Sequence, residues 1–278
     1  MSQQRSILIT GCSTGIGYYC AHALKQDGWQ VIASCRHSED VDRLKSEGLQ
    51  AIQLDVADSD SIFQGLEQAL ALTDGKLDAL FNNGAYGQPG AAEDLTRATL
   101  RKQFETNFFG WCELTNAVIK VMLNNNGGRI IHNSSVLGFA AMPFRGAYNA
   151  SKFALEGMAD TMRLELADTD IQLSLIEPGP ITSDFRKNAL RALESNIDFN
   201  ESRHGFKYAA AVHRLAKEGP ASKFTLGPEA VYKRLTHALN AKRAKPRYYV
   251  TFPTYLMGTL KRFLSTRMMD KILGRISS

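Results

Sequence analysis

The fold is decided by the stretch Ile-Leu-Ile-Thr-Gly-Cys-Ser-Thr-Gly-Ile-Gly at residues 7–17. Its apolar start has the character of a short buried strand, and a helical pattern runs on from about Gly15 to Gln26 and stops at Gly28. Glycines let the backbone come close to a pyrophosphate, and the N-terminus of the following helix supplies N–H groups and a positive dipole. The strand, the glycine turn and the helix together predict a phosphate-binding site for a dinucleotide.

The second predicted strand, Val31–Ser34, ends just before Arg36. In a dinucleotide-binding fold this strand end meets the adenosine ribose, where an acidic residue binds the ribose hydroxyls of NAD and an arginine accommodates the 2′-phosphate of NADP. The chain has Arg36 here and no carboxylate before Glu39. Ser13, inside the glycine turn, offers a further hydroxyl to that phosphate. These residues predict NADP, and the alternative is a solvated arginine at a strand end.

Strands and helices alternate along the rest of the chain. Apolar runs predict further strands at residues 51–54, 78–81, 129–133, 171–176 and 247–250. Helical patterns occupy residues 60–72 (after Asp58 or Ser59 as cap), 99–123, 147–167 and a segment that begins at 227–229 with Pro228 at the favoured first position. The alternation predicts one α/β domain over residues 1–278. Its core is a Rossmann-type doubly wound parallel sheet of about seven strands, with helices on both faces.

Polar residues gather at the predicted carboxyl ends of these strands. They are the glycine turn, Arg36, Asp55, Asn83, Ser135 and the pair Pro178-Gly179. Ligands of open parallel sheets bind beyond the carboxyl ends of the strands. We therefore expect one binding site along this rim.

Tyr148 and Lys152 are four residues apart in a predicted helix, so their side chains lie on one face. A nearby ammonium favours the phenolate and lowers the pKa of a tyrosine, which suits it to proton transfer near neutral pH. Among the nine tyrosines, Tyr148 alone has a lysine four residues further on. By itself the pair also fits an ordinary surface helix, so its weight comes from the neighbouring motifs.

The composition excludes several classes of protein. A hydrophobic content of 44% and a charged content of 22% are those of a globular chain. No apolar run reaches the roughly 18 residues of a membrane span, and no leader follows Met1, so a cytoplasmic protein is expected. Cys12, Cys20, Cys35 and Cys112 form no CxxC pair, which predicts neither disulfides nor a metal site. The net charge of +5 is spread out until the C-terminus and favours an anionic small ligand or a surface contact over nucleic acid.

Together these motifs make the sequence resemble the short-chain dehydrogenase/reductase family. The resemblance covers about residues 5–183 and continues more loosely to Val250. Its marks here are Thr10-Gly11-xxx-Gly15-x-Gly17, Asp55, Asn82-Asn83, Asn107, Ser135, Tyr148-xxx-Lys152 and Pro178-Gly179. Residues 142–144 and 151–157 are similar to those of NADP-dependent bacterial aldehyde reductases and of hydroxysteroid and retinol dehydrogenases.

The resemblance implies four catalytic residues. Tyr148 would protonate a substrate carbonyl oxygen as hydride arrives from the nicotinamide, and Ser135 would hydrogen-bond that oxygen. Lys152 would hold the nicotinamide ribose and favour ionisation of Tyr148. Asn107, inside a helix, would hold a water that connects the lysine to solvent.

The resemblance also implies an NADP site. Asp55 would contact the adenine and Asn83 the adenosine side of the cofactor, although either residue can instead fix a turn. The predicted cofactor contacts are Gly11, Ser13, Gly15, Ile16, Gly17, Arg36, Asp55, Val56, Asn83, Tyr148, Lys152, Pro178, Gly179, Ile181 and Ser183.

Two positions depart from the family pattern. The usual Asn-Asn-Ala-Gly order reads Asn82-Asn83-Gly84-Ala85, so a positive-φ residue, if the loop needs one, has moved or become Ala85. The family's threonine after Pro-Gly falls on Ser183, with Thr182 beside it, and either hydroxyl can meet the nicotinamide carboxamide.

Two segments lie outside the strong motifs. Residues 184–226 fall where the family keeps its substrate lid, and an apolar pocket or plain core is expected from Phe185, Phe199, Phe206, Tyr208, Phe139, Met142 and Tyr86. Residues 254–278 are predicted to form a C-terminal helical extension. Its apolar positions are Met268, Met269, Ile272, Leu273 and Ile276, and Arg267, Lys271 and Arg275 line another face. We expect it to pack on its own fold or on a sister subunit of a homo-oligomer; peripheral contact with an anionic membrane is the alternative.

The expected function is NADPH-dependent reduction of a small apolar aldehyde or ketone. One alternative is oxidation of a steroid or retinoid alcohol by a hydroxysteroid or retinol dehydrogenase. The other is a nucleotide-sensing scaffold that has lost catalysis. The four intact catalytic positions favour an enzyme.

Overall fold

The structure, a computed structural model, describes residues 4–277 and is built on a seven-stranded parallel sheet in the order β3-β2-β1-β4-β5-β6-β7. The strands are β1 Ser6–Ile9, β2 Gln30–Cys35, β3 Gln50–Gln53, β4 Ala79–Asn82, β5 Gly128–Asn133, β6 Ile171–Glu177 and β7 Arg247–Tyr249. The predicted doubly wound α/β fold is thus confirmed. The strand order reverses between β1 and β4, and ligands of such sheets bind at that switch point.

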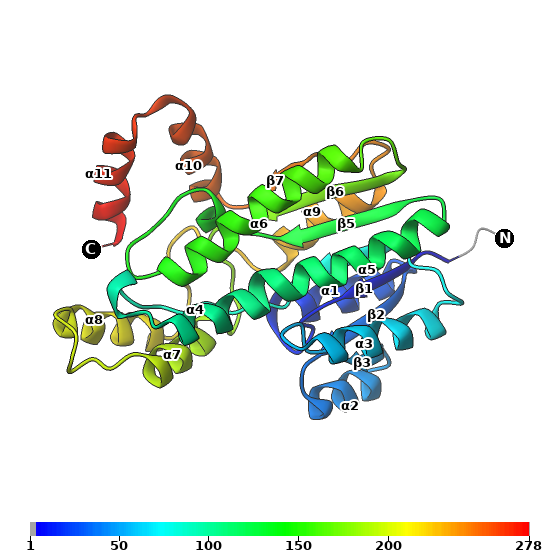
Figure 1. Cartoon of the computed structure of the whole chain (residues 1–278), viewed down its shortest axis with the longest axis horizontal. Helices are drawn as coiled ribbons and strands as arrows, with labels where there is room; N and C mark the ends of the chain where they lie inside the picture. Colours follow the sequence, from blue (N-terminus) through cyan, green and yellow to red (C-terminus); the bar gives the residue numbers. More distant parts are fainter. Residues whose placement is uncertain (1–3, 278) are drawn as a thin grey trace.

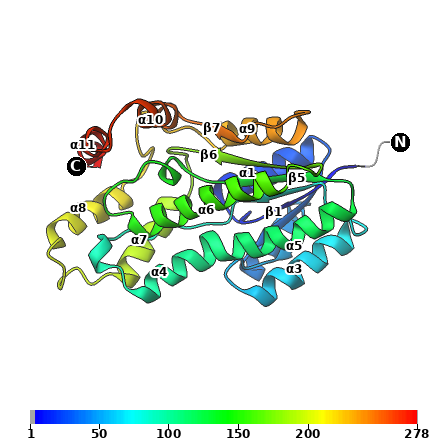
Figure 2. The same ribbon diagram turned by 45° about the horizontal axis from the view of Figure 1, so that its top comes forward.

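Helices cover both faces of the sheet (Figure 1 and Figure 2). One face carries α1 Gly15–Gln26, α2 Ser38–Ser46 and α9 Glu229–Asn240; the other carries α3 Ser59–Leu72, α5 Gly110–Asn124 and α6 Gly146–Glu165. Successive side chains of β1 point to opposite faces of the sheet, so this strand contributes to both apolar cores. Ile7 and Ile9 pack against the first helical layer, and Leu8 packs against the second. All three side chains are fully buried.

Local signals place the helix ends. Asp58 caps α3, since its carboxylate accepts a hydrogen bond from Ser61 N at 2.7 Å. Gly28 and Gly48 follow α1 and α2 with φ of +87° and +84°, the left-handed conformation that commonly ends a helix. Pro228 stands before α9 as its N-cap, so its predicted place as the first helical residue is wrong by one position.

The helix predicted at 99–123 begins earlier and is interrupted. α4 Arg97–Phe104 leads into a π-helical turn, η2 Glu105–Phe109, and only then into α5. A Cβ on Gly110 would lie 1.5 Å from Val56 O, so the start of α5 is in direct backbone contact with the loop that follows β3. The hydrophobic pattern predicted a helix but gave no sign of the extra residue in the turn.

Residues 184–226, predicted to be the substrate lid, contain two helices, α7 Phe185–Asn196 and α8 Gly205–Ala216. They pack on the start of α6 through an apolar cluster that includes Ala147, Leu193 and Tyr208. In Figure 1 they lie at the end of the molecule toward which the β5 arrow points, on the side of the predicted binding rim.

The C-terminal extension forms α10 Phe252–Phe263 and α11 Thr266–Ser277. Met269 and Leu273 are buried against Val136 and Met257, which supports packing of the extension on its own fold. Met268, predicted on the same apolar face, is 50% exposed, and the side chain of Ile276 lies outside the described part. Within residues 4–277, no helix has the length and apolar character needed to cross a membrane.

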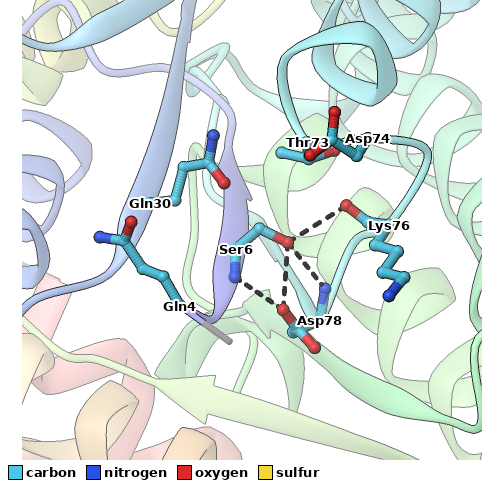
Figure 3. Close-up of a pocket in the computed structure, with 7 residues that line it drawn as sticks. All are labelled: Gln4, Ser6, Gln30, Thr73, Asp74, Lys76 and Asp78. Carbon is cyan, nitrogen blue, oxygen red and sulfur yellow. Dashed lines mark hydrogen bonds between the residues drawn. The ribbon is translucent and has the colours of Figure 1, made fainter. Parts of the chain in front are cut away.

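A small cavity of about 230 Å³ lies at the amino ends of the strands (Figure 3). There Asp78 Oδ2 accepts hydrogen bonds from Ser6 N at 2.7 Å and from Ser6 Oγ at 3.2 Å. The carboxylate ties the start of β1 to the start of β4. This cavity is at the opposite edge from the carboxyl ends where ligands bind, so we assign it a structural role.

Candidate active site

The glycine turn after β1 is packed too closely for larger residues. Gly11 has a φ of +71°, and a Cβ there would lie 2.4 Å from Gly84 Cα. A Cβ on Gly17 would lie 2.3 Å from Gly11 O. Neither Gly84 nor Ala85 has a positive φ, so these two positions do not need the left-handed conformation that was considered for the loop. Gly84 is needed instead because the backbone of Gly11 passes against it.

Two side chains from distant segments lock this turn. Asn83 Nδ2 donates to Thr10 O at 3.0 Å and to Gly11 O at 3.1 Å, which uses both amide hydrogens within the protein. Arg43 Nη2 in α2 donates to Ser13 O at 2.7 Å. The sequence analysis missed Arg43, although its partners Asp40 and Glu47 lie at helical spacing from it. These hydrogen bonds from distant segments fix the shape of the turn.

The residues at this turn fit a dinucleotide. Thr14, the N-cap of α1, makes no side-chain hydrogen bond to the helix, so the first N–H groups remain for an oxyanion. Arg36 is exposed at the end of β2, where its Nε lies 3.1 Å from His37 Nε2. Arg36 forms no ion pair with any carboxylate in the described part of the chain. Its charge is therefore available to an anionic ligand at this strand end.

The remaining predicted cofactor residues lie on the same rim. Asp55 Oδ1 accepts a hydrogen bond from Ala57 N at 2.9 Å and so fixes a turn. Val56 follows it against Gly110. A Cβ on Gly179 would lie 2.2 Å from Thr251 Oγ1, which explains glycine at this position. The other predicted contacts border the glycine turn and the end of β6; they are Ile16, Pro178, Ile181 and Ser183. The turn and the segment after β6 lie close together, because a Cβ on Gly15 would be 2.9 Å from Ser183 Cβ.

Tyr148 and Ser135 come together from α6 and the end of β5. Ser135 Oγ accepts a hydrogen bond from Leu137 N at 3.1 Å and lies within hydrogen-bonding reach of the Tyr148 hydroxyl. Burial raises the pKa of Tyr148 to about 12, and the hydrogen bond with Ser135 acts in the opposite direction. The predicted lowering of this pKa by Lys152 is not found. Burial dominates, and the ammonium lies 5.8 Å from the centroid of the Tyr148 ring.

Lys152 is fully buried and turned toward the core. Its Nζ donates to Asn133 O at 2.8 Å and lies 4.1 Å from the centroid of the Trp111 ring. Burial lowers the pKa of Lys152 to about 7, although Glu156 acts to raise it. The sequence analysis did not identify Trp111; its position four residues after Asn107 was the available signal.

Asn107 sits in the π-helical turn η2 and is fully buried. Its Oδ1 accepts from Tyr86 N at 3.2 Å and its Nδ2 donates to Tyr86 O at 2.9 Å. The same Nδ2 approaches Ser151 Oγ at 3.4 Å, next to Lys152. The four predicted catalytic residues thus converge, and π-helical turns often mark functional sites.

This geometry agrees with the family comparison. The model of the short chain dehydrogenase family matches residues 5–194, from the first strand through the glycine turn and the Tyr148/Lys152 helix. The chain belongs to the short-chain dehydrogenase/reductase family. Members are oxidoreductases that use NAD or NADP on small carbonyl or alcohol substrates, and that much holds for this protein.

Known members show how far the similarity extends. The chain is 40% identical over 270 residues to the uncharacterized oxidoreductase YbbO of Escherichia coli K12, covering 97% of this chain and 94% of that one. It is 36% identical over 196 residues to human retinol dehydrogenase 8, covering 67% and 62% of the two chains. The crystal structure of a short-chain dehydrogenase from Streptomyces avermitilis matches with a TM-score of 0.78 and 25% identity over 100% and 98% of the chains.

The aromatic residues predicted to line one pocket of this dehydrogenase are divided among several places. The rings of Phe199 and Tyr208 stack at 5.1 Å in the apolar cluster between α7, α8 and the start of α6. The ring of Phe139 stacks on that of Tyr249 at 5.6 Å, and Phe206 is 91% exposed. Phe185 lies at the active site, with its ring 5.4 Å from that of Tyr148. Of the predicted pocket residues in 184–226, only Phe185 contacts the catalytic tyrosine, while Phe199 and Tyr208 pack on each other.

A buried acidic pair supports the loops on either side of the dehydrogenase site. Ser134 Oγ donates to Glu156 Oε1 at 2.5 Å, and Arg247 Nη2 donates to Glu156 Oε2 at 3.0 Å. Glu177, which precedes Pro178, is fully buried 3.2 Å from Arg247, and burial raises its pKa well above the usual range. The network borders a cleft of about 460 Å³ between α6, β7 and α10. It fixes the residues next to Ser135 and Pro178.

Proposed function

We propose that this protein is an NADPH-dependent reductase that delivers hydride to the carbonyl of an aldehyde or ketone with an apolar body. The observation that carries the proposal is the convergence of Tyr148, Ser135, Lys152 and Asn107 at one rim of the sheet. A phenol with a pKa of about 12 stays protonated at neutral pH and is therefore ready to donate a proton.

Each residue has a separate task in this reaction. Bound NADPH supplies the hydride. Ser135 orients the substrate oxygen by a hydrogen bond, and Tyr148 gives that oxygen its proton. Lys152, as an ammonium, binds the nicotinamide ribose and stabilises the phenolate that forms. Asn107 holds η2 against Tyr86 and supports the route by which Tyr148 regains a proton.

The choice of NADPH rests on Arg36. Its guanidinium is exposed at the end of β2 and pairs with no carboxylate that the structure describes. An arginine can bind a phosphate through two parallel hydrogen bonds, and the missing acidic residue removes the usual acceptor for the ribose hydroxyls of NAD. Because the cellular NADP pool is kept reduced, this choice favours reduction.

A second candidate activity is oxidation of a retinoid or steroid alcohol. It is favoured by the similarity to human retinol dehydrogenase 8 over the segment that includes the active site. The same residues serve in this direction, with Tyr148 as base. The intact catalytic group argues against a scaffold that only senses nucleotide.

The test is a panel of aldehydes and ketones assayed by loss of NADPH absorbance, run beside a panel of steroid and retinoid alcohols with NADP. We expect turnover of medium-chain aldehydes with NADPH. Turnover confined to the alcohols would replace the proposal with the second candidate. Absence of turnover in both panels, with NADPH still bound, would favour the scaffold.

We further propose a cytoplasmic homo-oligomer. The described structure has four free cysteines, three of them buried, as expected of a reducing compartment. Phe263, at the end of α10, is 81% exposed and is available to a sister subunit. Light scattering of the full chain and of a variant truncated before α10 tests the assembly, and an unchanged mass per particle would contradict it. Sedimentation of the full chain with anionic liposomes tests the membrane alternative.

A further inference from the structure

The ring of Phe185 lies against the ring of the catalytic tyrosine. The ring centroids of Phe185 and Tyr148 are 5.4 Å apart and their planes meet at 69°, an edge-to-face contact. Phe185 is the first residue of α7, whereas Tyr148 belongs to α6. The contact brings the start of residues 184–226 directly to the side chain that is proposed to give the proton.

Gly87, in the loop after β4, leaves the space that the Phe185 ring fills. Gly87 is buried, and a Cβ built there would lie 2.7 Å from Phe185 Cζ and 3.0 Å from Phe185 Cε1. The third nearest atom, Tyr148 Cδ2, would be 3.7 Å away, which is an ordinary van der Waals distance. The φ of Gly87 is not positive, so its backbone conformation does not require glycine. Of the three atoms nearest to that Cβ, only the two of Phe185 are too close to allow a side chain.

Gln88, next to Gly87, ties the same loop to α7. Its Nε2 donates to Ala192 O at 3.2 Å, and its Oε1 accepts from Asn196 Nδ2 at 2.8 Å. Its backbone N donates to Gln103 Oε1 of α4 at 2.7 Å, and the residue is 1% exposed. The loop of Gly87 and the helix that begins with the aromatic ring are therefore held together by side-chain hydrogen bonds.

The chain just before Phe185 is also held. Ser183 Oγ accepts a hydrogen bond from Phe185 N at 3.4 Å, and Thr182 N donates to Leu226 O at 2.9 Å. A Cβ on Gly15 would lie 2.9 Å from Ser183 Cβ, so this segment rests against the glycine turn. The Phe185 ring is thus fixed from the side of the predicted cofactor site as well as from the loop after β4.

Core packing does not explain the position of the Phe185 ring. In the described chain, Phe185 lies outside the apolar cluster that joins α7, α8 and the start of α6. It remains 37% exposed, whereas Leu193 of the same helix is fully buried in that cluster. An apolar ring that is fixed at a catalytic side chain and is still partly exposed can contact a substrate.

The carbonyl carbon of a substrate carries two substituents, and in an aldehyde one of them is hydrogen. In the proposed reaction the carbonyl oxygen meets the hydroxyls of Tyr148 and Ser135, so the carbonyl carbon lies close to the Tyr148 side chain. The Phe185 ring already stands beside that side chain. A hydrogen needs little room there, whereas a carbon substituent needs the ring to move.

We propose that Phe185 is a specificity-determining residue that selects aldehydes over ketones. Its ring, seated over Gly87, occupies space beside Tyr148 that a second carbon substituent of the carbonyl would need. The proposal rests on the reductase function proposed above and narrows its substrate class to aldehydes.

The first experiment compares nonanal with decan-2-one, each with NADPH. The two compounds differ only in a hydrogen or a methyl group on the carbonyl carbon. Aldehydes are the more reactive class in any case, so the informative quantity is the change between proteins in the ratio of kcat/KM for nonanal to that for decan-2-one. Phe185→Ala should lower this ratio by about tenfold or more, the usual range for one methyl group against a packed apolar surface. An unchanged ratio in a variant that still reduces nonanal would overturn the inference and leave the reductase proposal intact.

Two further variants make this comparison decisive. Phe185→Leu keeps an apolar side chain and should lower the ratio by less than Phe185→Ala; it decides the question if the alanine variant is inactive with both compounds. Phe63→Ala is the matched control, because Phe63 is 52% exposed on α3, a helix that packs on α5 and β3. A ratio that falls as far in the control as in Phe185→Ala would overturn the inference.

A double-mutant cycle tests the contact between Gly87 and Phe185. Gly87→Ala alone should lower both the Tm and kcat/KM for nonanal, because the new Cβ displaces the Phe185 ring. In the Phe185→Ala background the same change should have little effect on either quantity, since the ring is gone. Effects of Gly87→Ala that are equal in the two backgrounds would show that the ring does not fill this space, and would overturn the inference.

A binding measurement separates the selection from catalysis. Calorimetric titration of the NADPH complex with nonan-1-ol and with decan-2-ol involves no turnover, because cofactor and alcohol are both reduced. We expect nonan-1-ol to bind about tenfold more tightly in the wild type, with the difference lost in Phe185→Ala. If no aldehyde is reduced but this difference appears, the role of Phe185 stands and the reductase proposal fails. Equal affinities, or tighter binding of decan-2-ol, would overturn the role of Phe185.

Discussion

The ammonium of Lys152 lies 4.1 Å from the centroid of the Trp111 ring, and both side chains are fully buried. Apart from this ring, Lys152 Nζ has Asn133 O at 2.8 Å as its hydrogen-bond partner in the described structure. Trp111 is itself held by a hydrogen bond from Nε1 to Gly84 O at 2.9 Å. A ring face attracts a desolvated cation by about 2 kcal/mol, so Trp111 opposes the loss of charge that burial promotes.

Replacing Trp111 by leucine should move the pH dependence of reduction. Lys152 loses its charge as the pH rises through about 7, so the rate should fall across that range. Loss of roughly 1.4 kcal/mol of attraction lowers its pKa by about one unit, and the falling limb of kcat should shift to lower pH by that amount. Trp111→Phe is the control, because it keeps a ring but loses the hydrogen bond to Gly84. If the falling limb of kcat lay at the same pH in the wild type and both variants, the ring would not act on the pKa of Lys152.

Tyr148→Phe should abolish reduction while leaving NADPH bound. The change removes the hydroxyl and keeps the ring that packs on Phe185. General acid catalysis typically contributes about 10²–10⁴-fold, and kcat should fall by that factor. Because the pKa of Tyr148 is about 12, the wild type should lose no proton from this residue up to pH 9. Activity within a few-fold of wild type would mean that another residue is the acid.

Arg36 should determine the cofactor preference. Loss of its contact with the 2′-phosphate is expected to cost about 2 kcal/mol, or roughly thirtyfold in affinity for NADPH. Arg36→Asp should lose more, since it repels the phosphate and offers the ribose of NAD an acceptor. The measurement is the ratio of kcat/KM with NADPH to that with NADH, with Arg101→Ala, on the surface of α4, as control. A wild-type preference for NADH would contradict the assignment.

His132 should make the protein sensitive to acid. Burial lowers the pKa of His132 to about 3, and its Nδ1 lies 3.2 Å from Asn82 Nδ2. The unfolded chain, with a pKa near 6.5, binds a proton that the folded state does not take up. Stability should therefore fall as the pH drops from about 6.5 toward 3. His132→Asn offers Asn82 an oxygen and cannot titrate, so urea unfolding at pH 7 and pH 4.5 should show a smaller loss in the variant than in the wild type.

Gly11→Ala should disrupt the cofactor turn. The Cβ of the alanine would lie 2.4 Å from Gly84 Cα, a backbone atom that can move only if the loop itself shifts. The φ of Gly11 is +71°, which an alanine rarely adopts. We expect lower stability and weaker binding of NADPH, measured by thermal unfolding and by fluorescence titration. Gly157→Ala is the matched control, since Gly157 is an exposed residue of α6 and a Cβ there would have no atom within 4 Å. That change should stabilise the protein by about 0.5–1 kcal/mol. A Gly11 variant that behaves like the control would contradict the packing argument.

Features governed by neighbouring residues could be predicted from the sequence. The strand before Gly11, the turn and the helix that ends at Gly28 follow from local hydrophobic period and glycine conformation, and the structure has them as predicted. Spacing alone also placed Tyr148 and Lys152 on one helix. Parallel topology then brought Ser135 to the same rim.

Features governed by contacts across the chain were decided only by the tertiary structure. The π-helical turn around Asn107 accompanies the close approach of Gly110 to Val56, which no local pattern encodes. Lys152 was expected to turn to Tyr148, but its ammonium lies by Trp111 and Asn133, and burial sets the pKa of both residues of the pair. The spacing of apolar residues and glycines along the sequence thus determined the strands, the turn and the catalytic helix. Burial and charge around each side chain depend on segments distant in sequence, so only the folded chain decided them.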